Sequence, residues 1–179
     1  MIDGYSKKRG FTLVEALVVV AIMGILSGIG VAGLQSAVAN SRIKDAGINV
    51  TAFMERAANE ATRLNEKLCV KVENSSKSLR VYKGGCSESL GDKVDEMNLE
   101  SSNNFIINGS CRVGNGTIQP YAGSLVTLTP KIGVSPIPSG CFLVQYGNSD
   151  RRAAIIKTTT KFAMFYQLSY DNGSSWTNP

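Results

Sequence analysis

Histidine, the side chain that most often does acid–base and metal chemistry near neutral pH, does not occur in this sequence of 179 residues. Its absence excludes histidine-based catalytic triads, histidine metal sites and general acid–base catalysis by histidine. A hydrolase would need a Ser–Lys or paired-carboxylate site instead, and no spacing in the sequence singles one out. We therefore expect a protein without enzyme activity and without a cofactor.

The cysteines are the next residues with chemistry of their own. They are Cys69, Cys86, Cys111 and Cys141. A zinc site would need tighter ligand spacing than these four have. An even number of cysteines in an exported chain favours two disulfides, with three possible pairings. We expect the pairs that are nearest in sequence, Cys69–Cys86 and Cys111–Cys141.

A basic stretch near the C-terminal end is a candidate nucleic-acid site. Four cations occur there with no acid among them: Arg151, Arg152, Lys157 and Lys161. Tyr166, Tyr170 and Trp176 follow, and cations with aromatic side chains bind nucleic-acid strands by phosphate contact and stacking. A solvated strand face with core aromatics gives the same pattern, so DNA binding is a hypothesis that competes with a structural role.

An acidic stretch, residues 88–100, raises the question of calcium. Asp92, Asp95 and Glu96 lie in it with Gly91 nearby. Calcium needs several oxygen ligands at defined loop positions, and the spacing of an EF-hand is absent. We therefore expect no metal site.

Glu15 stands at the head of the longest apolar run in the chain. From Ala16 to Leu34 the only polar side chain is Ser27, and about 20 apolar residues cross the hydrocarbon core of a bilayer as a helix. Because Lys7, Lys8 and Arg9 precede this run, the positive-inside rule places residues 1–10 in the cytoplasm and the long remainder outside. A carboxylate at membrane depth is costly, which makes Glu15 a functional candidate. Its partner must be the chain's own start or another molecule.

Two simpler interpretations of the apolar run compete. One is a secretory signal peptide, for which Ala37-Val38-Ala39 offers a cleavage site. The run is longer than the usual apolar core of a signal peptide, and Glu15 would be unusual there. The other is a plain membrane anchor, which leaves Glu15 and the Gly10-Phe11 junction unexplained.

Periodicity indicates the elements that position these residues. Apolar or small residues follow alternating steps of four and three, which places them on one helix face. They are Ile43, Gly47, Val50, Met54, Ala57, Ala61, Leu64 and Leu68. With no proline before Pro120, one helix is predicted from about Thr12 to about Leu64. The small residues in this stripe favour packing against a sheet over a coiled coil.

After Leu68 the period of apolar residues changes to two, which is typical of strands. About seven strands are expected, mostly antiparallel: 68–73, 79–82, 105–107, 125–129, 141–146, 153–158 and 163–170. Residues 86–104 are interpreted mostly as loop, 109–124 as irregular, and Pro136 and Pro138 as marking a connector. The predicted fold class is α+β, with one long N-terminal helix packed on an antiparallel sheet.

The sequence Lys-Lys-Arg-Gly-Phe-Thr-Leu-Val-Glu of residues 7–15, running into apolar sequence, resembles the N-terminus of type IV pilins and type II secretion pseudopilins. The resemblance implies that a prepilin peptidase cuts between Gly10 and Phe11 and that Phe11 is N-methylated. It implies that Glu15 meets the terminal amine of a neighbouring subunit during assembly. The implied partners are other pilin or pseudopilin subunits, the peptidase, an inner-membrane assembly platform, and membrane lipid before assembly.

The stretch from Ala57 to Glu66, running into residues 68–72, resembles the GspH/FimT group of minor pilins and pseudopilins. One departure from many major pilins is that Gly28, Gly30 and Gly33 stand where those have a proline. The expected function is a minor pilin or pseudopilin; the alternatives are a DNA-binding pilin of natural transformation, as some FimT-like proteins are thought to be, and a major pilin.

The resemblance also implies a division of the chain and a location. Residues 1–10 would be the leader peptide, 11–34 the transmembrane and filament-core helix, 35–68 the amphipathic half of the same helix, and 69–179 a periplasmic β-rich domain. The protein would wait in the bacterial inner membrane before it enters a pilus or pseudopilus.

Overall fold

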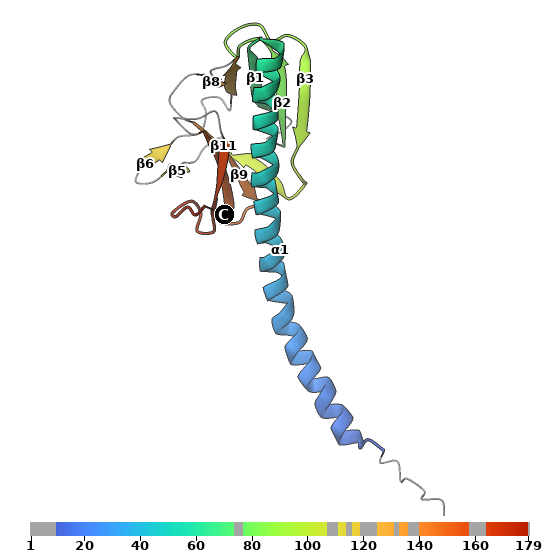
Figure 1. Cartoon of the computed structure of the whole chain (residues 1–179). Helices are drawn as coiled ribbons and strands as arrows, with labels where there is room; N and C mark the ends of the chain where they lie inside the picture. The colour runs from blue at the N-terminus through green and yellow to red at the C-terminus, as the bar shows by residue number, and fades with distance from the viewer. Residues whose placement is uncertain are drawn as a thin grey trace, which may run out of the picture. The chain divides into compact units, whose positions relative to one another are not determined.

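The computed structural model describes residues 10–73, 77–106, 111–113, 116–118, 125–130, 133–135, 140–157 and 164–178. Internal contacts divide the chain into two compact units, Met1–Val38 and Ala39–Pro179. The long helix begins in the first unit and ends in the second, and every strand among the described residues belongs to the second (Figure 1).

Helix α1 spans Leu13–Leu64, 52 residues. Its start is fixed by Thr12, whose Oγ1 accepts a hydrogen bond from the backbone N–H of Glu15 at 3.3 Å, as an N-cap side chain does. Its end is fixed by Asn65, whose φ of 51° is left-handed and ends helices in this way. The predicted helix from about Thr12 to Leu64 is confirmed. The predicted boundary of its amphipathic half at 68 is wrong, because Leu68 is already the first residue of strand β1.

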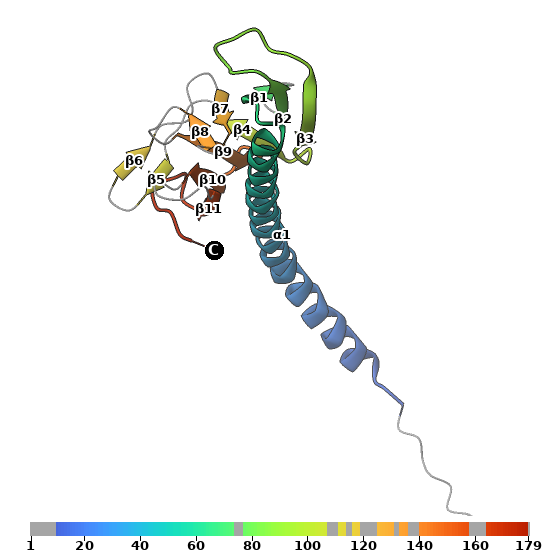
Figure 2. The same ribbon diagram turned by 45° about the horizontal axis from the view of Figure 1, so that its top comes forward.

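The strands of the second unit form two larger sheets and a small one (Figure 2). The first sheet has the order β3-β2-β1-β7-β8. Its strands are β1 Leu68–Glu73, β2 Ser78–Lys83, β3 Lys93–Asn98, β7 Leu125–Thr129 and β8 Gly133–Ser135. The second sheet has the order β11-β10-β9-β4. Its strands are β4 Asn103–Ile106, β9 Cys141–Tyr146, β10 Arg152–Lys157 and β11 Met164–Ser169. Strands β5 Cys111–Val113 and β6 Gly116–Ile118 pair with each other.

The core of the second unit lies between α1 and both larger sheets. The predicted stripe supplies its helical side, and Ala46, Phe53 and Ala58 widen it. From the sheets, apolar residues such as Val70, Val81, Leu128, Val144 and Ile155 complete the core. The expectation that the stripe packs on a sheet is confirmed, and so is the α+β fold class, since every strand pair among the described residues is antiparallel.

Gly47 sets how closely α1 approaches the second sheet. A Cβ atom at this position would lie 2.8 Å from Cδ2 of Tyr166 and 3.4 Å from Cβ of Ala153. Tyr166 belongs to β11 and Ala153 to β10. The absence of a side chain at Gly47 therefore lets the helix backbone pass close to these two strands.

The described residues contain eleven strands, more than the seven expected. The loop prediction for 86–104 is wrong, because β3 occupies part of it and pairs with β2. The pairing of β3 with β2 has a register shift opposite Val81 and Tyr82. Because of this shift, the apolar residues Val94 and Met97 do not follow a period of two, so the alternation that predicts a strand is absent here.

The other strand differences are of length. Strand β4 begins at Asn103, two residues before the predicted strand. Strands β5, β6 and β8 have three residues each, too few for any periodicity to show. Two of them lie in the stretch interpreted as irregular, and β8 lies in the one interpreted as a connector.

Candidate functional site

The apolar segment at the start of α1 is uncovered in the first unit. The large apolar side chains from Phe11 to Leu34 are exposed, with Phe11 at 82% and Leu34 at 65% of their full accessible surface. By length and composition α1 qualifies as a membrane span, as the first apolar segment of a signal sequence also would. Because a run of uncovered apolar side chains is unfavourable in water, this segment calls for lipid or for other apolar helices.

The Gly10-Phe11 junction lies just before the helix begins. Both residues are exposed and neither is helical. A Cβ atom at Gly10 would meet no other atom within 4 Å. An exposed peptide bond outside regular structure is what a peptidase can reach, so the described geometry is compatible with the predicted cleavage between these residues.

Glu15 occupies the first turn of α1 and is exposed. Its backbone N–H is the donor to Thr12 described above, and no hydrogen bond or ion pair of its carboxylate occurs within the described residues. The spacing Thr12-x-x-Glu15 is that of a capping box, and an acid in the first turn is also favoured by the helix dipole. This local role was missed in the sequence analysis, although the four-residue pattern itself indicates it.

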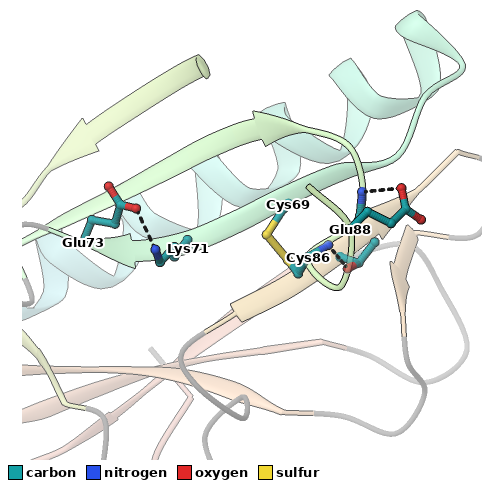
Figure 3. The surroundings of a disulfide bond; sticks show 7 residues. Cys69, Lys71, Glu73, Cys86 and Glu88 are labelled. Atoms are coloured by element: carbon teal, nitrogen blue, oxygen red, sulfur yellow. Dashed lines mark hydrogen bonds and ion pairs between the residues drawn. A yellow bond between two sulfur atoms is a disulfide. The ribbon is translucent and has the colours of Figure 1, made fainter. Parts of the chain in front are cut away.

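One predicted disulfide is present. Cys69 on β1 and Cys86, in the loop after β2, are bonded with their Cα atoms 4.9 Å apart (Figure 3). The backbone N–H of Cys86 also donates to Oγ1 of Thr127 on β7 at 3.1 Å. Cys141 is disulfide-bonded as well. The side chain of Cys111 lies outside the described residues, so the Cys111–Cys141 pairing stays a prediction.

Of the four cations of the basic stretch, the structure describes the side chains of Arg151 and Arg152. Arg151 donates from Nε to the side-chain oxygen of Asn40 on α1. Arg152 follows it at the start of β10 and is half-buried, with an Nε that is buried and without a hydrogen-bond partner. The side chains of Lys157 and Lys161 lie outside the described residues.

A charged network crosses the first sheet from β1 to β3. The carboxylate of Glu73 accepts from Arg80 at 2.7 Å and from Lys71 and Tyr82 at 3.0 Å. These bonds, that of Lys71 first, lower the pKa of Glu73 to about 2. Arg80 also binds Glu96 at 2.9 Å. The network stabilises the strand pairing, and its carboxylates are engaged by cations of the same sheet.

The acids considered for calcium lie in such pairs. Asp95 forms an ion pair with Arg56 of α1 at 2.6 Å. Glu96 binds Arg80 and, at 2.8 Å, Lys93. These ion pairs lower the pKa of Glu96, with Lys93 the larger cause. Among the described residues, no group of three or more metal-ligating side chains could hold an ion.

Comparison with known proteins bears on the N-terminal segment. A family model described as a prokaryotic N-terminal methylation motif matches residues 5–31. No curated protein and no solved structure matches the chain. The matched residues include the basic leader, the Gly10-Phe11 junction, Glu15 and most of the exposed apolar segment, but not the stretch that resembles the GspH/FimT group. The chain therefore carries the prepilin signal of type IV pilin-like proteins at the head of an exposed apolar helix.

Proposed function

We propose that this protein is a minor pilin or pseudopilin that enters a type IV pilus or a type II secretion pseudopilus through its N-terminal helix. The observation that carries the proposal is the methylation motif placed on a helical segment whose apolar side chains are uncovered. Before assembly this segment lies in the inner membrane with the second unit in the periplasm. In the filament, the apolar helices of neighbouring subunits replace lipid.

Assembly on this account follows from burial and charge. The exposed apolar side chains between Phe11 and Leu34 gain contact with neighbouring helices at each step of the array. Cleavage after Gly10 creates a cationic amine on Phe11. Inside a bundle of low dielectric this amine and the Glu15 carboxylate of a neighbour each offset the other's cost of burial. Other axial registers between neighbouring helices would leave the Glu15 carboxylate unpaired, so Glu15 selects one register of the helices.

The minor-pilin assignment has support from the end of α1. Ala57, Ala58 and Ala61 are buried there, and only residues 65–67 separate the helix from β1. This close succession of a small-residue helix face and a strand is the feature on which the GspH/FimT resemblance rests. The share of the chain among the subunits of sheared filaments distinguishes the roles, since a major pilin would dominate them.

DNA binding is not the function that we adopt. Arg151 is engaged by Asn40, and the side chains of Lys157 and Lys161 lie outside the described residues, so no observation favours DNA binding.

Replacing Glu15 by Val tests the proposed role of the acid. We expect Glu15→Val to reach the membrane in normal amounts but to be depleted in the sheared filament or pseudopilus fraction, because its helix no longer pairs with the neighbour's amine. The matched control is Glu15→Asp, which keeps the charge and should retain more incorporation than the Val variant. Normal incorporation of Glu15→Val would remove the assigned role of the carboxylate.

A further inference from the structure

A groove runs along one flank of α1 in the second unit. Its helical wall consists of residues that recur every three or four positions and so share one helix face: Arg42, Asp45, Asn49, Ala52 and Arg56. The opposite wall is the segment 97–103, from the end of β3 to the start of β4. Strand β3 lies beside α1 in both views of the ribbon (Figures 1 and 2). The groove has a volume of about 420 Å³, and Phe53, Met97 and Leu99 contribute apolar side chains to its lining.

The charges of the groove do not balance. Arg42 pairs with Glu100 at 3.3 Å, and Arg56 pairs with Asp95 at 2.6 Å, so both arginines are already neutralised. Asp45 is exposed, and its carboxylate forms no hydrogen bond or ion pair within the described residues. Two cations stand against three acids, which leaves one uncompensated negative charge, that of Asp45.

Asn103 adds a hydrogen-bond acceptor that lacks a donor. This residue lines the groove from the wall opposite α1 and is 1% exposed. Its Oδ1 atom is buried and has no hydrogen-bond partner. A buried acceptor without a donor is unfavourable by more than an ordinary hydrogen bond contributes. The groove therefore combines an unpaired carboxylate with an unpaired amide oxygen, and both call for a donor from outside the described residues.

We propose that the groove binds a lysine or arginine side chain of a different filament subunit. The cationic head of that side chain meets the Asp45 carboxylate and donates to Oδ1 of Asn103, and its aliphatic stem lies along Phe53, Met97 and Leu99. Long basic side chains bury their stems on apolar surface in this way. Hydrogen bonds from a cation to a carboxylate are shorter and stronger than those between neutral groups.

Charge and the role of the chain together identify the occupant. An acidic partner would meet the carboxylates of Asp45, Asp95 and Glu100, with no unpaired cation among the described residues that line the groove. The neighbours of a minor subunit are other subunits, so the basic side chain belongs to a different protein and not to a second copy. In this respect the contact rests on the proposed function, and it adds the surface by which a neighbour is recognised.

Photo-crosslinking in the native cells tests the contact with the full chain. A photo-reactive amino acid replaces Ala52, an exposed residue of the helical wall, and mass spectrometry maps the attachment site of any adduct. We expect an adduct with a different subunit of the sheared filament fraction, attached beside a lysine or arginine of that subunit.

Substitutions of Asp45 show whether the adduct depends on charge. Asp45→Asn keeps the shape of the side chain and should lower the adduct yield about threefold, as for one partly exposed ion pair. The matched control is Glu55→Gln, at an exposed position of the same helix that does not line the groove, and it should leave the yield unchanged. Asp45→Lys should lower the yield too, and replacing the mapped basic residue of the neighbour by Glu should restore it in that variant.

Four results would overturn the contact: no adduct, an adduct with a second copy of this chain, an unchanged yield with Asp45→Asn, or no recovery after the exchange of charges. The amount of chain in the sheared filament fraction of the same cells tests the proposed function separately. Chain that is present in filaments without the adduct refutes the contact alone. An adduct that depends on Asp45, in a chain that is absent from filaments, supports the groove as a site for a basic side chain and refutes the proposed function.

Discussion

The residues near the N-terminus fall into two groups, those that start the helix and those that have no such structural role. Thr12 and Glu15 form a local pair that starts the helix, and this pair would serve any helix. The Gly10-Phe11 junction has no structural role of that kind, since both residues are exposed and Gly10 has open space around it. The junction is therefore the place where a substitution reports on processing without disturbing the fold.

Gly10→Val is expected to abolish cleavage, because a branched side chain at this position obstructs the bond that the peptidase must reach. The precursor should accumulate in the membrane with its leader attached, which the mass of the intact chain measures. Leu13→Val, a substitution of another exposed residue of the segment, is the control and should be processed. A shortened product from Gly10→Val would contradict the assigned cleavage site.

Two carboxylates of the second unit should make its stability depend on pH in the acid range. The Glu73 pKa lies at about 2 in the fold, against a usual value of 4.5. Hydrogen bonds from Ser175 lower the Asp171 pKa from 3.8 to about 2. Because these folded-state values are depressed, their stabilising effect is present above the usual pKa and is lost as pH falls towards 2.

The urea midpoint of the processed chain in detergent, followed by the fluorescence of Trp176, should therefore be steady from pH 7 to about 5 and fall below that. The variant Glu73→Gln, which cannot titrate at this position, should show a weaker fall. An equal midpoint at pH 7 and pH 2.5 would show that the ion pairs of Glu73 and the hydrogen bonds of Asp171 do not contribute to stability.

The roles of many single residues could be predicted from the sequence, because the prepilin motif and the cysteines are recognised by residue type and spacing. The Cys69–Cys86 pairing followed from nearness in sequence. The engagement of Arg151 by Asn40 joins residues far apart in the chain, and no local pattern encodes such a contact.

Among the elements, α1 is the one on which the second unit is built. Its stripe was predictable because a helical period persists over many residues, and Ile43, Val50 and Met54 are fully buried as expected. Strand β3 was not predictable, since the register shift in its pairing with β2 breaks the period of two. Gly47 links α1 to the second sheet at a point where there is no room for a side chain.

Gly47→Val should destabilise the second unit by about 1–3 kcal/mol, because the new side chain overlaps the ring of Tyr166. The free energy of unfolding in urea measures this cost. Asn59 lies on the exposed side of α1, and valine has a helix propensity similar to that of asparagine. Asn59→Val should therefore cost less than 0.5 kcal/mol, roughly the limit for surface changes. If both variants lost the same amount, close packing at Gly47 would not be the cause.

At the scale of the whole molecule, an uncovered apolar helix segment and a folded β-rich unit belong to one chain. The first explains why the protein needs a membrane or other helices. The second has a core of its own between α1 and both larger sheets.

The mature N-terminus of the protein from native cells, determined by mass spectrometry, tests the central claim most directly. We expect a chain that begins at Phe11 and carries a methyl group on its terminal amine. A chain that begins at Asn40 would be a secreted domain without the apolar segment, and one that keeps Met1 would be a static membrane anchor. Either of these results would contradict the account of a processed filament subunit.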